Sequence, residues 1–269
     1  MKLAAQMNTL RAYCTTQQDL LDTLRKVADM GFDGVELEYG MLKVADRETL
    51  AAHLATIGLE TASIRNPFAR TEFGLEDMIA QAKTLNCKNV GIGTMTTAQF
   101  NQGQAGYDRY FAQLEKITQR FREEGLRPVY SLRNHEFVRQ NGQWIFDKML
   151  AAPESAGIFF ETDVLPLTRA AVEPPRIFAQ LTGRMPVCRL TDQKIRENEM
   201  YFFFPEREEC PLGEGLFDLP LWAGAAVNAG AEWFVLGQDL CDRDPLACLA
   251  VSLQKARYFN DIRYMEADI

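Results

Sequence analysis

Short β-rich runs alternate with amphipathic helical stretches along the whole chain, and this alternation constrains the fold more than any other feature. The first helical stretch, Asp19–Met30, places leucine, valine and alanine at helical spacing and is followed by Gly31, a residue type that often ends helices. About eight such units follow one another without a linker-like or low-complexity break. The expected strands are 3–6, 34–38, 59–64, 89–93, 128–132, 158–161, 187–190 and 233–236, and the expected helices are 19–30, 46–57, 75–85, 107–124, 146–151, 175–181, 219–228 and 245–257.

This order of elements predicts how the sheet is built. Strands that alternate with helices form a parallel sheet with right-handed crossovers, and eight units in 269 residues close most economically as a barrel. An open, doubly wound sheet is the alternative, but no GxGxxG turn follows the first strand. We therefore predict an α/β fold in which residues 1–269 form a single (β/α)8 TIM barrel domain.

Two insertions interrupt the regular alternation. Phe137–Trp144 is typical of a hairpin that turns through Asn141 and Gly142, and Lys194–Gly215 includes an aromatic strand at Tyr201–Phe204. Each insertion follows a strand, so both are expected on the face of the barrel that carries active sites.

Composition and charge exclude several classes of partner. A formal net charge of −8 and a pI near 5.0 give no attraction to nucleic acid or to anionic membranes. No apolar run approaches the ~20 residues that span a bilayer, so we expect a soluble, cytoplasmic protein. The six cysteines form no CxxC pair and are expected to be reduced packing residues.

Five short segments in register carry a resemblance to a known family: QMNTLR at 6–11, GFDGVEL at 31–37, KTLNCKNV at 83–90, GEGLFD at 213–218 and AGAEW at 229–233. Together they resemble the xylose isomerase-like TIM barrels, the sugar phosphate isomerase/epimerase superfamily that also includes inosose dehydratases. The likeness covers essentially the whole chain. It implies a small-molecule partner, namely a sugar, sugar acid or sugar phosphate, and it leaves a homodimer open because relatives commonly pair.

The same resemblance implies a metal site that this chain has partly lost. The family uses Mn, Mg, Co or Zn held by a Glu, an Asp, a His and a second Glu, and these positions fall on Glu136, Asp163, Arg189 and Gly237. Two of the four ligands are therefore absent, and guanidinium is a permanent cation that cannot ligate. We expect no bound metal cofactor, although a shifted alignment would make His135 a ligand.

Arginine also replaces histidine at two other positions of the family pattern, Arg65 and Arg133. Strand alternation puts each of Arg65, Arg133 and Arg189 on the same face as the residue two positions before it. If these faces point inward, the arginines would meet five acids at the mouth of the barrel: Glu36, Glu38, Glu136, Asp163 and Asp239. Two interpretations stay open: a salt-bridge network that replaces the metal, or a pocket for an anionic ligand.

Two functions follow from these residues. As an isomerase or epimerase-like enzyme, the chain would use Glu136 as the one base of a metal-independent proton transfer, with Arg189 polarising a carbonyl. The expected substrate-binding residues are Gln6, Arg65, Arg133, Asp163 and Asp239. The alternative is a catalytically inactive barrel that binds an anionic sugar or a partner protein.

Overall fold

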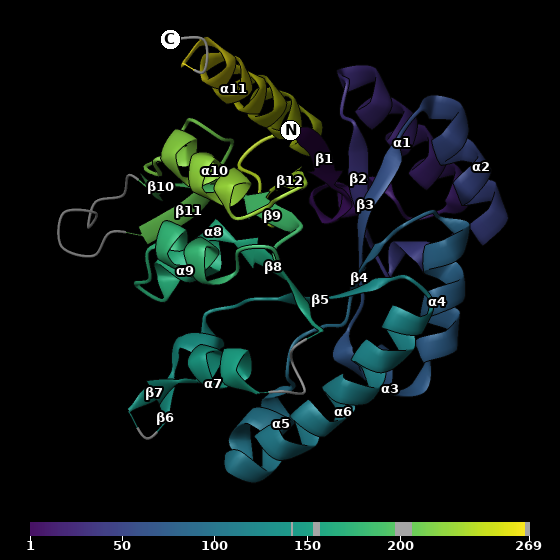
Figure 1. Cartoon of the computed structure of the whole chain (residues 1–269). Helices are drawn as coiled ribbons and strands as arrows, with labels where there is room; N and C mark the ends of the chain where they lie inside the picture. Colours follow the sequence, from purple (N-terminus) through teal and green to yellow (C-terminus); the bar gives the residue numbers. More distant parts are fainter. Residues whose placement is uncertain (141, 153–156, 197–205, 267–269) are drawn as a thin grey trace.

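The computed structural model describes residues 1–140, 142–152, 157–196 and 206–266. Its centre is a closed barrel of eight parallel strands in the order β1-β12-β9-β8-β5-β4-β3-β2, which confirms the predicted (β/α)8 TIM barrel. Figure 1 shows these strands enclosed by helices. The barrel strands are β1 (Lys2–Gln6), β2 (Gly34–Glu38), β3 (Glu60–Arg65), β4 (Asn89–Gly91), β5 (Arg127–Ser131), β8 (Phe159–Asp163), β9 (Val187–Leu190) and β12 (Trp233–Leu236).

Most helices lie where the hydrophobic periodicity predicts them, with ends within a few residues. Six short elements escaped the sequence analysis because each has too few turns to show a period: α3, α5, α8 and the 3-10 turns η1, η2 and η3. The helices are α1 (Gln17–Met30), α2 (Arg47–Ile57), α3 (Phe68–Phe73), α4 (Leu75–Thr84), α5 (Thr97–Asn101), α6 (Gln104–Glu123), α7 (Ile145–Ala151), α8 (Val164–Arg169), α9 (Pro174–Gln180), α10 (Leu219–Asn228) and α11 (Pro245–Glu266), with 3-10 turns η1 (Met7–Tyr13), η2 (Met41–Lys43) and η3 (His135–Phe137).

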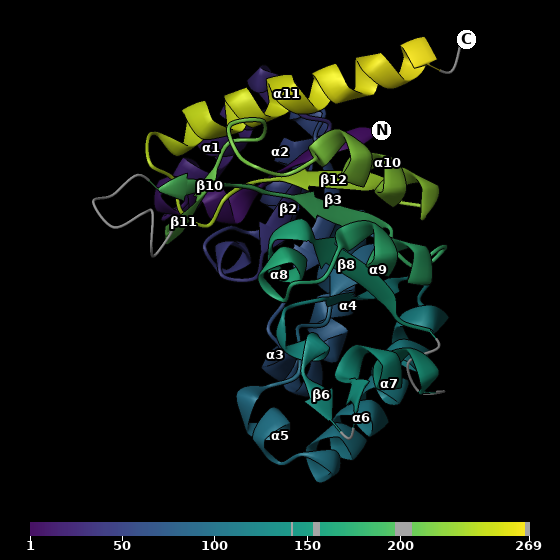
Figure 2. The ribbon, with the colours of Figure 1, turned by 90° about the vertical axis from the view of Figure 1, so that its left-hand side faces the viewer.

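Local signals set the ends of the first helix. Thr16 and Asp19 form a capping box at its start, in which each side chain accepts a hydrogen bond from the other residue's backbone N–H. Gly31 ends it with φ of 91°, a left-handed conformation that glycine adopts without strain. The last helix, α11, packs against β1 and β12 where the barrel closes, and Figure 2 shows it lying along one end of the molecule.

Both predicted insertions form antiparallel pairs. β6 (Arg139–Gln140) pairs with β7 (Gln143–Trp144), and β10 (Asp192–Arg196) pairs with β11 (Glu206–Cys210). The expected aromatic strand Tyr201–Phe204 lies outside the described residues.

The core has two parts. A large cluster fills the space between strands and helices, and a separate small one contains Ala4, Ala62, Val187, Trp233 and Val235. Val187 lies two residues before Arg189, and Val235 lies two residues before Gly237, so each pair shares one face of its strand. The small cluster is therefore the apolar floor beneath the polar end of the barrel.

All six cysteines are free, and Cys241 alone among them is not fully buried. In the described part of the chain, no helix is both long enough and apolar enough to cross a membrane.

Candidate functional site

Acidic side chains and two arginines meet at the carboxyl ends of the barrel strands, and we call this group the mouth cluster. Each member comes from the last residues of a strand or from the turn just after it, so strand length and register place it. The mouth cluster consists of Glu36 and Glu38 on β2, Arg65 on β3, Glu161 and Asp163 on β8, Arg189 on β9 and Asp239 after β12.

Arg65 lies between carboxylates from two sides of the barrel. Its Nη1 is 3.1 Å from Glu38 Oε1 and 3.9 Å from Glu36 Oε1, and its Nε is 4.0 Å from Glu161 Oε1. Burial opposes the charge of this guanidinium, but Glu161, Glu36 and Glu38 outweigh burial and raise the pKa of Arg65. Arg65 is therefore a fixed cation that three carboxyl groups share.

Glu36 is the most unusual acid of the mouth cluster. It is fully buried, and its Oε2 accepts a 2.7 Å hydrogen bond from Ser63 Oγ, while Oε1 has no hydrogen-bond partner among the described residues. Burial first, and the charge of Glu161 second, raise the pKa of Glu36 to about 8. Glu36 therefore holds its proton at neutral pH, whereas Glu161 faces Arg65 and accepts from Ser131 Oγ at 3.2 Å.

Arg189 occupies the opposite side of the mouth cluster. Its Nη1 lies 3.4 Å from Asp163 Oδ2, and its Nη2 lies 3.9 Å from Asp239 Oδ1. Asn8 Nδ2 donates to the same Asp239 oxygen at 3.1 Å, and Asp163 Oδ1 accepts from the Leu165 N–H that begins α8 at 3.0 Å. The structure thus brings together Arg189, Asp163 and Asp239, as the sequence predicted.

A cavity of about 710 Å³ opens beside the mouth cluster, over the ends of β2, β3, β4 and β5. Glu38, Arg65 and Arg133 line it together with Thr94 and Thr96. Burial raises the pKa of Glu38, and the positive charges of Arg65, Arg189 and Arg133 oppose that rise. Among the described residues, the half-buried Arg133 guanidinium forms no salt bridge. It is the cation in this wall that remains available to a ligand.

Glu136 does not join the predicted group, which corrects the expectation that it faces Arg189. Its carboxylate accepts hydrogen bonds from the Tyr130 hydroxyl and from the backbone N–H of Arg133 at 2.8 Å. Tyr130 and Ser131 are neighbours on β5, so their side chains point to opposite faces, and Ser131 is the one that bonds Glu161 inside the barrel. Glu136 therefore lies on the helix side of β5.

Gln6 fills the space that the absent fourth ligand would need. A Cβ at Gly237 would lie 2.4 Å from Gln6 Oε1 and 2.6 Å from Thr9 Oγ1, closer than real contacts allow. Thr9 Oγ1 donates to Gln6 Oε1 at 3.2 Å and accepts from the Gln238 N–H at 2.9 Å. Gln6 is thus fully buried at the end of β1, with its Nε2 unpartnered among the described residues, and it does not line the cavity.

The donor set at the mouth does not fit a divalent cation. Among residues the structure describes, no three or more His, Cys, Asp or Glu side chains are grouped as metal ligands. Two guanidiniums lie between the carboxylates, and Asp163 already uses Oδ1 to cap α8. These carboxylates are neutralised by arginine, which cannot ligate.

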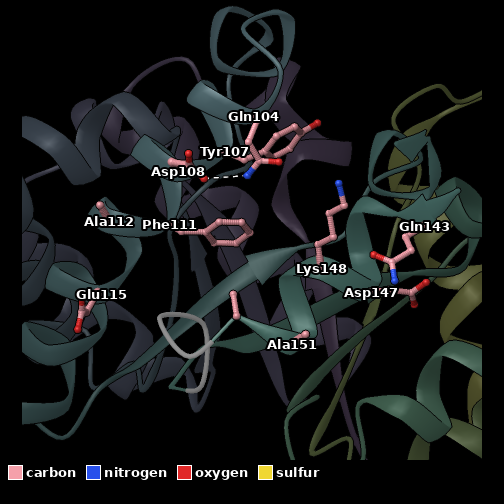
Figure 3. A pocket seen from close by; sticks show the side chains of 11 residues that line it. Gln104, Tyr107, Asp108, Phe111, Ala112, Glu115, Gln143, Asp147, Lys148 and Ala151 are labelled. Carbon is pink, nitrogen blue, oxygen red and sulfur yellow. Dashed lines mark hydrogen bonds between the residues drawn. The ribbon is translucent and has the colours of Figure 1, made fainter. Parts of the chain in front are cut away.

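A second cavity, of about 650 Å³, lies outside the barrel between α6 and α7 (Figure 3). Its walls carry Asp108, Glu115 and Asp147 with Lys148, and Gln104 Nε2 donates to Asp108 at 2.8 Å. None of the mouth cluster reaches it, so it does not contribute to the site.

Sequence reasoning placed Glu36 and Glu38 near the inward arginines without naming them as site residues, and it missed Glu161. The signal for Glu161 was present, because Phe-Glu-Thr-Asp at 160–163 puts Glu161 and Asp163 on one face of a strand. Glu36 and Glu38 occupy alternate positions of β2 in the same way.

Comparison with known proteins gives similarity in structure but not in sequence: no family model and no curated protein matches the chain. An L-ribulose 3-epimerase is 16% identical with a TM-score of 0.75, over 100% of this chain and 97% of that one. A sugar phosphate isomerase/epimerase from Parabacteroides distasonis ATCC 8503 is 13% identical with a TM-score of 0.73, over 93% and 91% of the two chains. The IOLI protein with a bound zinc atom is 12% identical with a TM-score of 0.71, over 96% and 98%. The chain therefore has the fold of the xylose isomerase-like TIM barrels, as the sequence predicted.

Proposed function

We propose that this barrel is a sugar isomerase-type enzyme that acts on a sugar acid or sugar phosphate without a divalent metal. The observation that carries the proposal is the cavity at the carboxyl ends of β2–β5, where the Arg133 guanidinium stands beside the Glu38–Arg65 pair and has no carboxylate partner among the described residues. Relatives in structure include an L-ribulose 3-epimerase and a sugar phosphate isomerase/epimerase.

The cavity suits a small anionic sugar. Its volume of about 710 Å³ is that of a small-molecule site, and its wall combines hydroxyls with arginine. The planar guanidinium of Arg133 can bind a carboxylate or phosphate through two parallel hydrogen bonds. Thr94 supplies a hydroxyl for the hydroxyls of the sugar.

Glu38 is the base that this geometry favours, in place of Glu136. Its carboxylate takes the proton from the carbon next to the substrate carbonyl, and the C–H electron pair forms the enediolate double bond. Arg65, 3.1 Å from Glu38, stabilises the oxygen that becomes negative. Glu38 then returns the proton to the former carbonyl carbon while the proton of the adjacent hydroxyl passes to the former carbonyl oxygen, which converts an aldose to a ketose. Burial raises the pKa of Glu38 above that of an ordinary carboxyl group, and a raised pKa suits a general base.

Proton exchange with solvent tests this proposal directly. The protein, dialysed against EDTA, is incubated in D2O with a panel of pentose phosphates, hexose phosphates and uronic acids, and deuterium at the carbon next to the carbonyl is followed by NMR. We expect exchange with at least one of these sugars, a loss of about 100-fold or more in Glu38→Gln, and a raised KM in Arg133→Met. Arg139→Met, a change of an exposed arginine on β6, is the matched control.

Three results would contradict the proposal. They are exchange that appears only after a divalent metal is added, normal exchange in Glu38→Gln, and binding that does not change in Arg133→Met.

A binding barrel without turnover is the second candidate. The observation that favours it is the pairing of Arg65 with the carboxylates of Glu38 and Glu161, which neutralises the group that would stabilise an oxyanion. Binding of an anionic sugar that depends on Arg133, with no deuterium exchange, would support this candidate instead.

A further inference from the structure

The buried carboxylate of Glu136 is fully engaged although it contacts none of the mouth cluster. It is 1% exposed, Oε1 accepts from the Tyr130 hydroxyl, and Oε2 accepts from the Arg133 backbone N–H at 2.8 Å. His135 Nε2 also lies 2.7 Å from Oε1, but without the alignment of a hydrogen bond. Such a carboxylate has a structural task that a free base would not have.

The bond to Arg133 closes a tight turn at the end of β5. The turn η3 is held by hydrogen bonds from Phe137 N to Asn134 O and from Val138 N to His135 O, each 3.2 Å long. The Glu136 side chain then reaches back three residues to the Arg133 N–H. The direction in which the Arg133 side chain leaves the backbone is therefore fixed at the wall of the cavity.

Tyr130 fixes the other side of the carboxylate. Its ring packs against Tyr110 and Phe160 with centroids 6.2 Å away in each case, between α6 and the barrel. Burial, and then the negative charge of Glu136, raise the pKa of Tyr130 well above its ordinary value, so its hydroxyl remains a donor. Glu136 thus connects the rigid aromatic layer to the backbone that carries Arg133.

We infer that Glu136 is a positioning residue that holds Arg133 ready for the anionic group of the ligand. This inference rests on the proposed function, because it needs Arg133 to bind that group. It replaces the role of proton-transfer base that the sequence suggested for Glu136. Its specific consequence is that removal of the carboxylate acts on ligand binding only through Arg133.

A double-mutant cycle tests this consequence, with inorganic phosphate as the probe and calorimetry or phosphorus NMR as the readout. We expect Arg133→Met and Glu136→Leu each to weaken phosphate binding by about 10-fold, and the double variant to bind no more weakly than Arg133→Met alone, within about 2-fold. Glu136→Gln should stay within about 3-fold of the wild type, because its amide oxygen still accepts from the Arg133 N–H. Glu123→Leu, on the exposed face of α6, is the control.

The outcomes separate the two proposals. If Arg133→Met binds phosphate as well as the wild type, the proposed function fails. If Arg133→Met binds weakly but Glu136→Leu lowers binding by its full factor in that background, Glu136 acts on the fold in general and the positioning role is wrong. If Glu136→Leu does not fold, the NMR signal of the Arg133 side chain is measured in Glu136→Gln instead. A signal unchanged from the wild type supports the inference, and a signal averaged to the position of free arginine overturns it.

Discussion

At the scale of single residues, arginine side chains supply the positive charge that lies among the acids of the mouth cluster. A guanidinium cannot lose its proton at physiological pH, so any change of protonation in the mouth cluster falls on its carboxyl groups. Glu36 lies as near Arg65, at 3.9 Å, as Glu161 does at 4.0 Å, but Glu36 is fully buried and also meets the negative charge of Glu161. Glu36 therefore becomes the acid that keeps its proton.

This protonation predicts how stability depends on pH. In the unfolded chain Glu36 titrates near pH 4.5, and in the fold its pKa is about 8. Between these values only the folded state holds the proton, so stability falls as pH rises, by at most about 1.4 kcal/mol per pH unit from this group. Glu36→Gln removes this titrating carboxyl group, so its contribution to the pH dependence of stability disappears. Compared with wild type, its free energy of unfolding should rise by about 2 kcal/mol or more between pH 5.5 and pH 8.5.

Urea unfolding at the two pH values measures this difference. Equal changes in wild type and Glu36→Gln would mean that Glu36 is ionised in the fold at neutral pH. Glu48→Gln, on the exposed first turn of α2, is the control and should follow the wild type.

At the level of elements, one carboxylate holds the second insertion against the barrel. Asp192, the first residue of β10, is fully buried, and its Oδ2 accepts from Gly213 N at 2.9 Å and Gly215 N at 3.1 Å. Its Oδ1 accepts from Gln193 N at 2.8 Å and from Phe217 N at 3.3 Å. The GEGLFD segment thus wraps around Asp192 and returns the chain to α10.

Asp192→Ala leaves these N–H groups without an acceptor, so we expect a loss of about 3 kcal/mol of stability and faster hydrogen exchange confined to residues 211–218. Asp192→Asn keeps one acceptor oxygen and should lie between wild type and Asp192→Ala. Hydrogen exchange followed by mass spectrometry checks both. Protection of this segment that does not change in Asp192→Ala would show that other contacts hold it.

For the whole molecule, the neutralised mouth predicts a barrel whose stability does not depend on metal. A site with a Kd of about 10 µM would add about 2.7 kcal/mol at 1 mM metal, which raises the melting temperature by several degrees. We expect the EDTA-treated protein and the same protein with 1 mM Mn²⁺ or Zn²⁺ to melt within about 1 °C of each other. Scanning calorimetry measures this, with elemental analysis of the dialysed protein. A rise of several degrees, or about one equivalent of metal retained, would contradict the prediction.

The sequence by itself determined the barrel and the inward arginines, because both depend on local periods. Helical and strand periodicity fix each βα unit, and the two-residue period of a strand decides that Arg65 and Arg189 enter the interior. Glu136 lies beyond the end of β5, where the chain turns and no period applies, so only the tertiary structure could place its carboxylate against Tyr130.

The tertiary structure also decided which charges are paired. The Arg133 guanidinium has no salt bridge among the described residues, while Arg65 has three carboxyl groups within 4.0 Å, although both line the same cavity at the carboxyl ends of the barrel strands. In the sequence, Gly237 stands at the position of an absent metal ligand. In the structure, Gln6 from the first strand fills the space that a side chain at Gly237 would occupy. Contacts of this kind join residues far apart in the chain, and their distances are set when the barrel closes β1 against β12.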